Sequence, residues 1–260
     1  MAEPSVVRPD EVDPEIEPLL YPCNKLGLDA PFRWLKLGWQ DLNRARAQSL
    51  VYGAGLAVFA YLVTVLAVVG GNVVALFSLA VAFILAGPVL AFGLYSISRQ
   101  LEQGREPRLG ICLRESRNHL RNELLFALVM LVVLLVWARA ASMVHVFFPV
   151  GEELGVLGWI EFLAVGSAVG SIFAAIVFSA SVVALPMMLD RNTDAITSAL
   201  TSVAAVIQNK GVMALWAFLI ASLVLIGFAT AYLGLVLVLP LIGHASWHAY
   251  KETVKAEDTE

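Results

Sequence analysis

Two long stretches of the chain carry no acidic, basic or histidine side chain. The first runs from Leu50 to Ser98 and the second from Gly211 to Gly243. An α-helix of roughly 20 apolar residues crosses the hydrocarbon core of a bilayer, so each stretch can hold two membrane spans joined by a tight turn. The overall hydrophobic content of 59% and mean hydropathy of +0.80 exclude an ordinary soluble protein.

Two further apolar segments, Leu124–Ala138 and Phe162–Leu189, bring the expected number of spans to six. Backbone polar groups exposed to lipid must be satisfied within their own segment, so we expect every span to be a helix. The sequence therefore predicts an all-α polytopic membrane protein. The expected spans are Ser49–Val69, Asn72–Tyr95, Glu123–Met143, Phe162–Leu189, Val212–Ala231 and Tyr232–Tyr250.

The basic residues predict the orientation of these spans. Sixteen of the seventeen Lys and Arg residues fall on one side of the membrane, and Arg139 near the outer end of the third span is the exception. Cytoplasmic loops carry the excess of Lys and Arg, so we expect both termini to be cytoplasmic. The short loops favour a bacterial inner membrane. Cys23 and Cys112 would both lie on the reducing side, where a structural disulfide is not expected.

The chain divides into three regions by composition. Residues 1–30 are acidic and rich in proline, which predicts a disordered cytoplasmic arm, either a solvated tail or a docking arm for a partner. Residues 31–250 form the membrane domain, and residues 251–260 form a cytoplasmic tail. Residues 1–31 contain no apolar segment of the kind found in a signal peptide.

The membrane domain reads as an imperfect threefold repeat of a cytoplasmic amphipathic helix, a span, a turn and a second span containing proline. The amphipathic helices align at 41–50, 115–124 and 202–211. Pro88, Pro186 and Pro240 each fall in one even-numbered span, where proline kinks a helix and frees a backbone carbonyl. Matched kinks would shape a common inner face, for packing or for gating.

The segment before the first span predicts an interfacial helix. In residues 31–42 the aromatic residues Trp34 and Trp39 alternate with the cations Arg33 and Lys36. Tryptophan and basic side chains of this kind favour the headgroup layer of a membrane. We therefore expect this helix to lie along the inner leaflet.

Small residues form a ridge in the fourth span. Gly166, Gly170 and Ala174 recur at four-residue spacing, which allows close approach of a neighbouring helix. This pattern predicts a packing seam inside the protein more readily than a dimer interface.

His244 and His248 are the strongest candidates for a ligand-binding pair. Their four-residue spacing places both imidazoles on one helix face, as a metal or haem site needs. No third or fourth ligand is tied to them by sequence spacing, so hydrogen bonding to a neighbouring helix is the main interpretation and haem or metal binding the alternative. A proton-linked or substrate role is also open.

The sequence indicates no enzymatic chemistry. It contains no P-loop, dinucleotide fingerprint, metalloprotease helix or nucleophile elbow. We therefore expect no catalytic residue, no cofactor apart from the haem or metal alternative, and no nucleic-acid partner.

Four segments carry a resemblance to a known family. They are residues 31–42, 87–95, 185–191 and 239–250. The chain resembles a proteobacterial family of predicted integral membrane proteins of unknown function, over residues 31 to about 252. Some relatives are loosely labelled as cytochrome c oxidase-associated, which implies a respiratory context.

Three hypotheses follow for the function. The first is a non-enzymatic accessory or scaffold subunit of a larger membrane complex, whose partners are the bilayer and other subunits. The second is a transporter or channel for a small solute or lipid, which a cavity lined by Ser and Tyr near the prolines would favour. The third is a haem or metal protein using His244 and His248.

Overall fold

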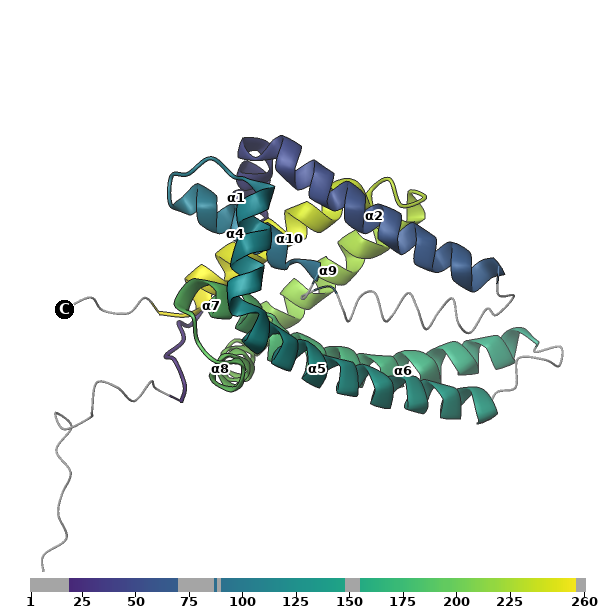
Figure 1. Cartoon of the computed structure of the whole chain (residues 1–260). Helices are drawn as coiled ribbons and strands as arrows, with labels where there is room; N and C mark the ends of the chain where they lie inside the picture. Colours follow the sequence, from purple (N-terminus) through teal and green to yellow (C-terminus); the bar gives the residue numbers. More distant parts are fainter. Residues whose placement is uncertain (1–18, 70–86, 88–89, 148–154, 256–260) are drawn as a thin grey trace, which may run out of the picture.

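The computed structural model describes residues 19–69, 87, 90–147 and 155–255. Within these ranges the regular structure is helical, and the one isolated β-bridge joins Cys23 to Val254. The described helices, shown in Figure 1, are α1 Ala30–Arg44, α2 Arg46–Val69, α4 Phe92–Glu102, α5 Leu109–Phe147, α6 Val156–Ser181, α7 Ala184–Arg191, α8 Ala195–Gln208, α9 Lys210–Ala229 and α10 Leu235–Thr253.

Within the described ranges, four helical segments are long and apolar enough to cross a membrane, and they coincide with the first, third, fourth and fifth predicted spans. They are Arg46–Leu66, Leu124–Val144, Ile160–Arg191 and Lys210–Ala229. Most of the second predicted span lies outside the described residues. The sixth corresponds to α10, which carries His244, His248, Lys251 and Glu252 toward its end and is not among the four. The number six therefore stays a prediction.

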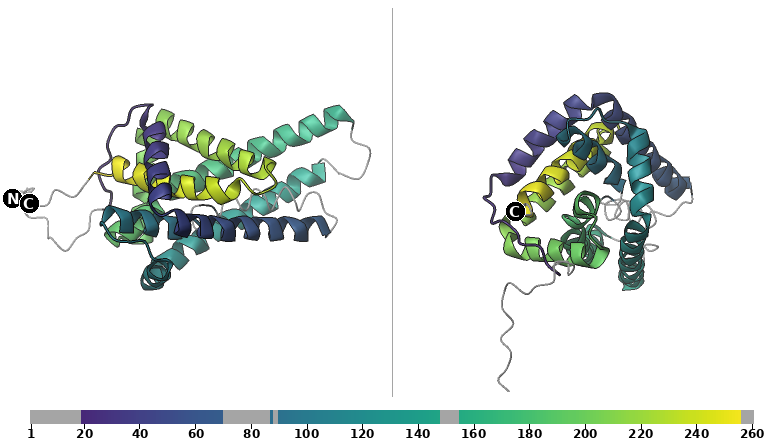
Figure 2. Two further views of the ribbon diagram at one scale, coloured as in Figure 1. Left: turned by 90° about the horizontal axis from the view of Figure 1, so that it is seen from above. Right: turned by 60° about the vertical axis from the view of Figure 1, so that its left-hand side comes forward.

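Helix α10 is the element around which the other helices of this end are arranged. It packs against α1, α2, α4 and α9, and α1 lies across it in Figure 2. Small residues allow two close approaches to α10. A Cβ atom on Gly38 of α1 would lie 2.7 Å from the backbone nitrogen of Ala245, and one on Gly53 of α2 would meet Pro240 Cγ at 2.6 Å.

Two of the three prolines predicted to kink membrane spans lie in the described residues, and they have different structural roles. Pro240 lies inside α10, where it removes the hydrogen bond to the carbonyl of Val236. That carbonyl faces Gly53 of α2, which has no side chain to exclude it. Pro186 lies in the first turn of α7, where a helix needs no donor from its third residue. The expected kink in the fourth span is thus a break between α6 and α7. Pro88 lies outside the described residues.

Helices α1 and α8 each lead into an apolar helix through one non-helical residue. Ala45 between α1 and α2 has φ −111° and ψ 39°, and Asn209 between α8 and α9 has φ −121° and ψ 40°. The similar junctions match the expected likeness of the first and third repeat units. The threefold repeat itself stays a prediction, since the corresponding side chains of 111–123 lie outside the described residues.

The described part of the N-terminal arm is bound to the protein rather than free. The Leu26 amide donates to Asn209 Oδ1 at 2.9 Å, and Asn209 Nδ2 donates to the carbonyl of Asn24 at 2.9 Å. The Asn24 amide donates to the Thr253 carbonyl at 2.8 Å. The acidic, proline-rich composition of residues 1–30 predicts a disordered arm. The backbone of its described part nevertheless hydrogen-bonds to Asn209 and to Thr253, contacts that composition does not predict.

The docked arm makes a testable prediction for Cys23. Burial raises the pKa of the Cys23 thiol, and the nearby charge of Arg191 lowers it by less. In a Cys112→Ser background, we expect Cys23 to react with iodoacetamide at pH 7.5 several-fold more slowly than a peptide cysteine, because less of it is thiolate. Asn209→Ala should accelerate the reaction by releasing the arm. Asn43→Ala, which loses only a bond within α1, is the control, and equal rates in the two variants would contradict the docking.

Candidate functional site

The two histidines of α10 belong to a buried polar network at the end of the molecule where α1, α2, α4 and α10 meet. His244 Nε2 lies 2.8 Å from Ser49 Oγ, and His244 Nδ1 lies 2.7 Å from Ser98 Oγ. Ser98 donates to Asp41 Oδ2 at 2.9 Å, and His248 Nε2 lies 2.8 Å from the same oxygen. The four-residue spacing thus directs both imidazoles to one face, and Asp41 joins them.

The hydrogen-bond directions in this network follow from Ser98. Its single proton goes to Asp41, so its oxygen must accept from His244 Nδ1–H. His244 Nε2 then accepts the hydroxyl proton of Ser49. His244, Ser49 and Ser98 are at most 1% exposed. A polar group at such a depth is stable only when it is paired, so the network holds three helices against α10.

This arrangement bears on the haem or metal hypothesis. Both ring nitrogens of His244 bond to serines, so a metal could bind only by displacing Ser49 or Ser98. Within the described residues, no three His, Cys, Asp or Glu side chains gather in a way that could hold a metal ion. The hypothesis remains a prediction for an absorbance spectrum, and the observed contacts are those of structural hydrogen bonding.

Tryptophans and carboxylates join the same end of the molecule. Trp34 Nε1 donates to Glu252 Oε2 at 2.7 Å, and Trp247 Nε1 donates to Glu102 Oε2 at 3.0 Å. Trp34 is 0% exposed and meets Trp216 edge-on, with ring centroids 5.5 Å apart. The interior position differs from the headgroup position expected for Trp34. The aromatic–cation pattern did not reveal it because its partners lie on α9 and α10.

The other residues expected at the membrane interface are on the surface. Trp39 is 46% exposed, and Arg33 and Lys36 are also exposed. Arg33 pairs with Asp29 and Glu252. Helix α1 therefore has one face buried on α10 and an opposite face that carries Trp39 and Lys36, so the interfacial position remains a prediction for that face alone.

The small-residue ridge of α6 does not make the expected close contact within the described residues. A Cβ atom on Gly166 or on Gly170 would meet no atom within 4 Å. Ala174 packs with Trp137 and Val177 where α5 and α6 run side by side. Of the three ridge residues, Ala174 alone joins a described apolar cluster.

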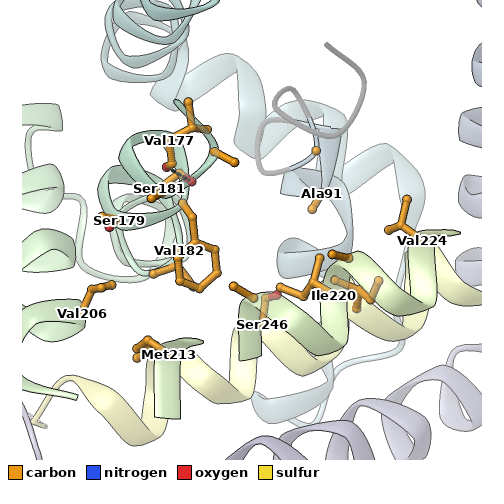
Figure 3. Close-up of a pocket in the computed structure, with 18 of the residues that line it drawn as sticks. Ala91, Val177, Ser179, Ser181, Val182, Val206, Met213, Ile220, Val224 and Ser246 are labelled. Atoms are coloured by element: carbon orange, nitrogen blue, oxygen red, sulfur yellow. Dashed lines mark hydrogen bonds between the residues drawn. The ribbon is translucent and has the colours of Figure 1, made fainter. Parts of the chain in front are cut away.

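A cavity of about 520 Å³ lies between α6 and the pair α9 and α10. Figure 3 shows Val177, Ser181 and Val182 on one side and Met213, Ile220 and Ser246 across from them. The volume lies in the range of roughly 300–1,000 Å³ usual for small-molecule sites. Gly243 also lines it, one turn after Pro240. A cavity lined by Ser and Tyr near the prolines was the feature expected to favour the transport hypothesis; this lining contains four serines and Tyr95 but is mainly aliphatic.

Two of the serines that line the cavity are hydrogen-bonded to their own helix. Ser181 Oγ donates to the Val177 carbonyl at 2.6 Å, and Ser171 Oγ donates to the Ser167 carbonyl at 2.7 Å. The remaining lining is mainly aliphatic. Such a wall favours an apolar chain over a polar solute, which would lose most of its hydration on entering the cavity.

The surface of the long helices defines the class of protein. On α5 alone, Leu124, Leu128 and Leu135 are 62%, 58% and 60% exposed. A contiguous apolar surface of this extent is characteristic of contact with lipid. Together with the four apolar helices, it identifies an integral membrane protein made of helices.

The comparisons agree with this class. Residues 76–190 match the family described as "Predicted integral membrane protein (DUF2189)". The match confirms the resemblance to a family of predicted integral membrane proteins, and it covers α4 to α7, a shorter part than residues 31 to 252. Searches of curated proteins and of solved structures give no match.

Proposed function

We propose that this chain is a non-enzymatic, multi-pass membrane protein that binds a lipid-like amphipathic molecule in the cavity between α6, α9 and α10. This proposal is related to the second hypothesis of the sequence analysis, a transporter or channel for a small solute or lipid. The observation that carries it is the cavity wall, which is mainly aliphatic and in which Ser171 and Ser181 bond back to their own helix. A bilayer supplies apolar chains at high concentration, so a cavity of this kind inside a membrane protein suits a lipid chain.

The proposed setting is a bacterial inner membrane crossed six times, with α10 and the predicted span Asn72–Tyr95 as the two spans beyond the four apolar helices. The basic residues support cytoplasmic termini. The bridge between Cys23 and Val254 supports a common side for the two ends, since it holds them together. Reporter fusions at each terminus test this orientation, and a periplasmic signal from either end would contradict it.

Filling the cavity should remove the bound molecule. Ala217 lines the cavity on α9 and is partly buried, so Ala217→Trp would place an indole where the ligand lies. We expect wild-type protein in nanodiscs to retain a lipid-sized mass in native mass spectrometry, and Ala217→Trp to lose at least about 80% of that signal, which corresponds to a loss of roughly 1 kcal/mol in binding.

The control is Leu225→Trp on the same helix, since Leu225 is 61% exposed on the outer surface. This variant should bind as the wild type does. Equal retention of lipid in Ala217→Trp and Leu225→Trp would show that the signal comes from the outer surface and would contradict the proposal.

The accessory-subunit hypothesis remains a separate prediction. It requires a stoichiometric partner that co-purifies in mild detergent. A cavity ligand and a partner subunit are compatible with each other, so the two experiments are read independently.

A further inference from the structure

A second, shallower pocket adjoins the cavity at the start of α9. Its volume is about 300 Å³, and its lining includes Lys25, Gln208, Asn209 and Lys210. Lys210 also lines the apolar cavity. The two hollows therefore share a basic residue at their boundary, with an apolar wall on one side of it and a polar pocket on the other.

The charge of this boundary is positive and uncompensated in the described part of the chain. Both lysines are exposed, and no described carboxylate forms an ion pair with either of them. The nearest acid along the chain from Lys25 is Asp29, and it pairs with Arg33. Lys251 shows the contrast, since it contacts both Glu102 and Asp190.

The amides of the shallow pocket are engaged elsewhere. Asn209 accepts from the Leu26 amide and donates to the Asn24 carbonyl, while Gln208 lies 3.4 Å from the Cys23 carbonyl. The groups available to a ligand there are thus the two ammonium groups. A lysine can bury its aliphatic stem against apolar surface and keep its charge in water, which suits the position of Lys210 between the two hollows.

We propose that the occupant is an anionic membrane lipid whose acyl chain lies in the cavity and whose acidic group pairs with Lys210 and Lys25. This inference rests on the proposed function, because it names the chemical class of ligand for the same cavity. Basic residues also lie on the side of the membrane predicted to be cytoplasmic, where anionic headgroups attract lysine. A carboxylate or phosphate bound by an ammonium gains a charge-assisted hydrogen bond.

Oleate and monoolein are the probes that test the headgroup. They share one acyl chain and differ in charge, so binding of each to delipidated full-length protein separates chain recognition from headgroup recognition. We expect the wild-type protein to bind oleate more tightly than monoolein. Lys210→Gln should lower the affinity for oleate roughly three- to tenfold and leave the affinity for monoolein unchanged. Lys210→Arg should restore the affinity for oleate. Lys25→Gln should act in the same direction. Lys36→Gln, on the exposed face of α1, is the control and should change neither.

Three results would count against the inference. The first is unchanged oleate affinity in both Lys210→Gln and Lys25→Gln while Ala217→Trp still blocks both probes. This result overturns the headgroup assignment and leaves the proposed function intact. A matching loss in Lys36→Gln would assign the effect to general surface charge and overturn it as well. Failure of wild type to bind either probe contradicts the proposed function and the inference together.

Discussion

Gly53→Leu should prevent the close packing of α2 on α10. The added Cβ alone would collide with the Val236 carbonyl and lie 2.6 Å from Pro240 Cγ. Neither neighbour can rotate away, because one is backbone and the other is a ring fixed to it. Overpacking ordinarily costs about 1–3 kcal/mol, and we expect the upper end of that range or more. The measurement is the apparent unfolding temperature of purified protein in detergent.

Gly55→Leu is the matched control for this prediction. Gly55 lies two residues further along α2, and a Cβ there meets no atom within 4 Å among the described residues. Leucine is favoured over glycine in a helix by roughly 1 kcal/mol at either position, so the difference between the variants isolates the contact with α10. If both variants unfold at the same temperature, α2 and α10 do not pack as described.

His244→Leu should cost about 2–3 kcal/mol of unfolding free energy. The change removes the acceptor of the Ser49 hydroxyl and the donor to Ser98, and both serines are buried. A buried polar group without a partner costs roughly 1–3 kcal/mol. Ser98 keeps its bond to Asp41, which limits the loss. The apparent unfolding temperature and the yield of monodisperse protein both report this effect.

Variants at two other residues of the same network provide comparisons for His244→Leu. Ser49→Ala breaks one bond of the same network and should cost about 1 kcal/mol. His248→Gln should cost less, because the side chain at 248 is 22% exposed and an amide can still donate to Asp41. The expected order is therefore His244→Leu, Ser49→Ala, then His248→Gln. A larger loss at His248 than at His244 would place the essential contact elsewhere.

The membrane helices could be predicted from the sequence because they depend only on residues that are neighbours along the chain. Uninterrupted apolar residues must leave water as a helix, so α2, α5, α6 and α9 follow from composition along the chain. The shared face of His244 and His248 follows equally from helix geometry. The class of protein could therefore be predicted without knowing which helices are in contact.

The site depended on contacts that sequence spacing does not contain. Ser49 and His244 are 195 positions apart, and Trp34 and Glu252 are 218 apart. From the sequence alone, Asn209 is only a residue between two helices, because its bonds to the N-terminal arm cannot be predicted from spacing. The Gly166–Gly170 ridge is the opposite case, because the sequence pattern is present but no described atom lies within 4 Å of a Cβ placed on either glycine. Tertiary packing decides both cases.

Photocrosslinking tests the central claim, an apolar ligand in the cavity, most directly. A fatty acid carrying a diazirine near the end of its chain would be bound to full-length protein in nanodiscs, activated, and mapped by peptide mass spectrometry. The account predicts saturable labelling at cavity residues such as Val182 and Met213, abolished by excess oleate and by Ala217→Trp. Labelling confined to outer residues such as Phe218 and Leu225, with no competition by oleate, would contradict it.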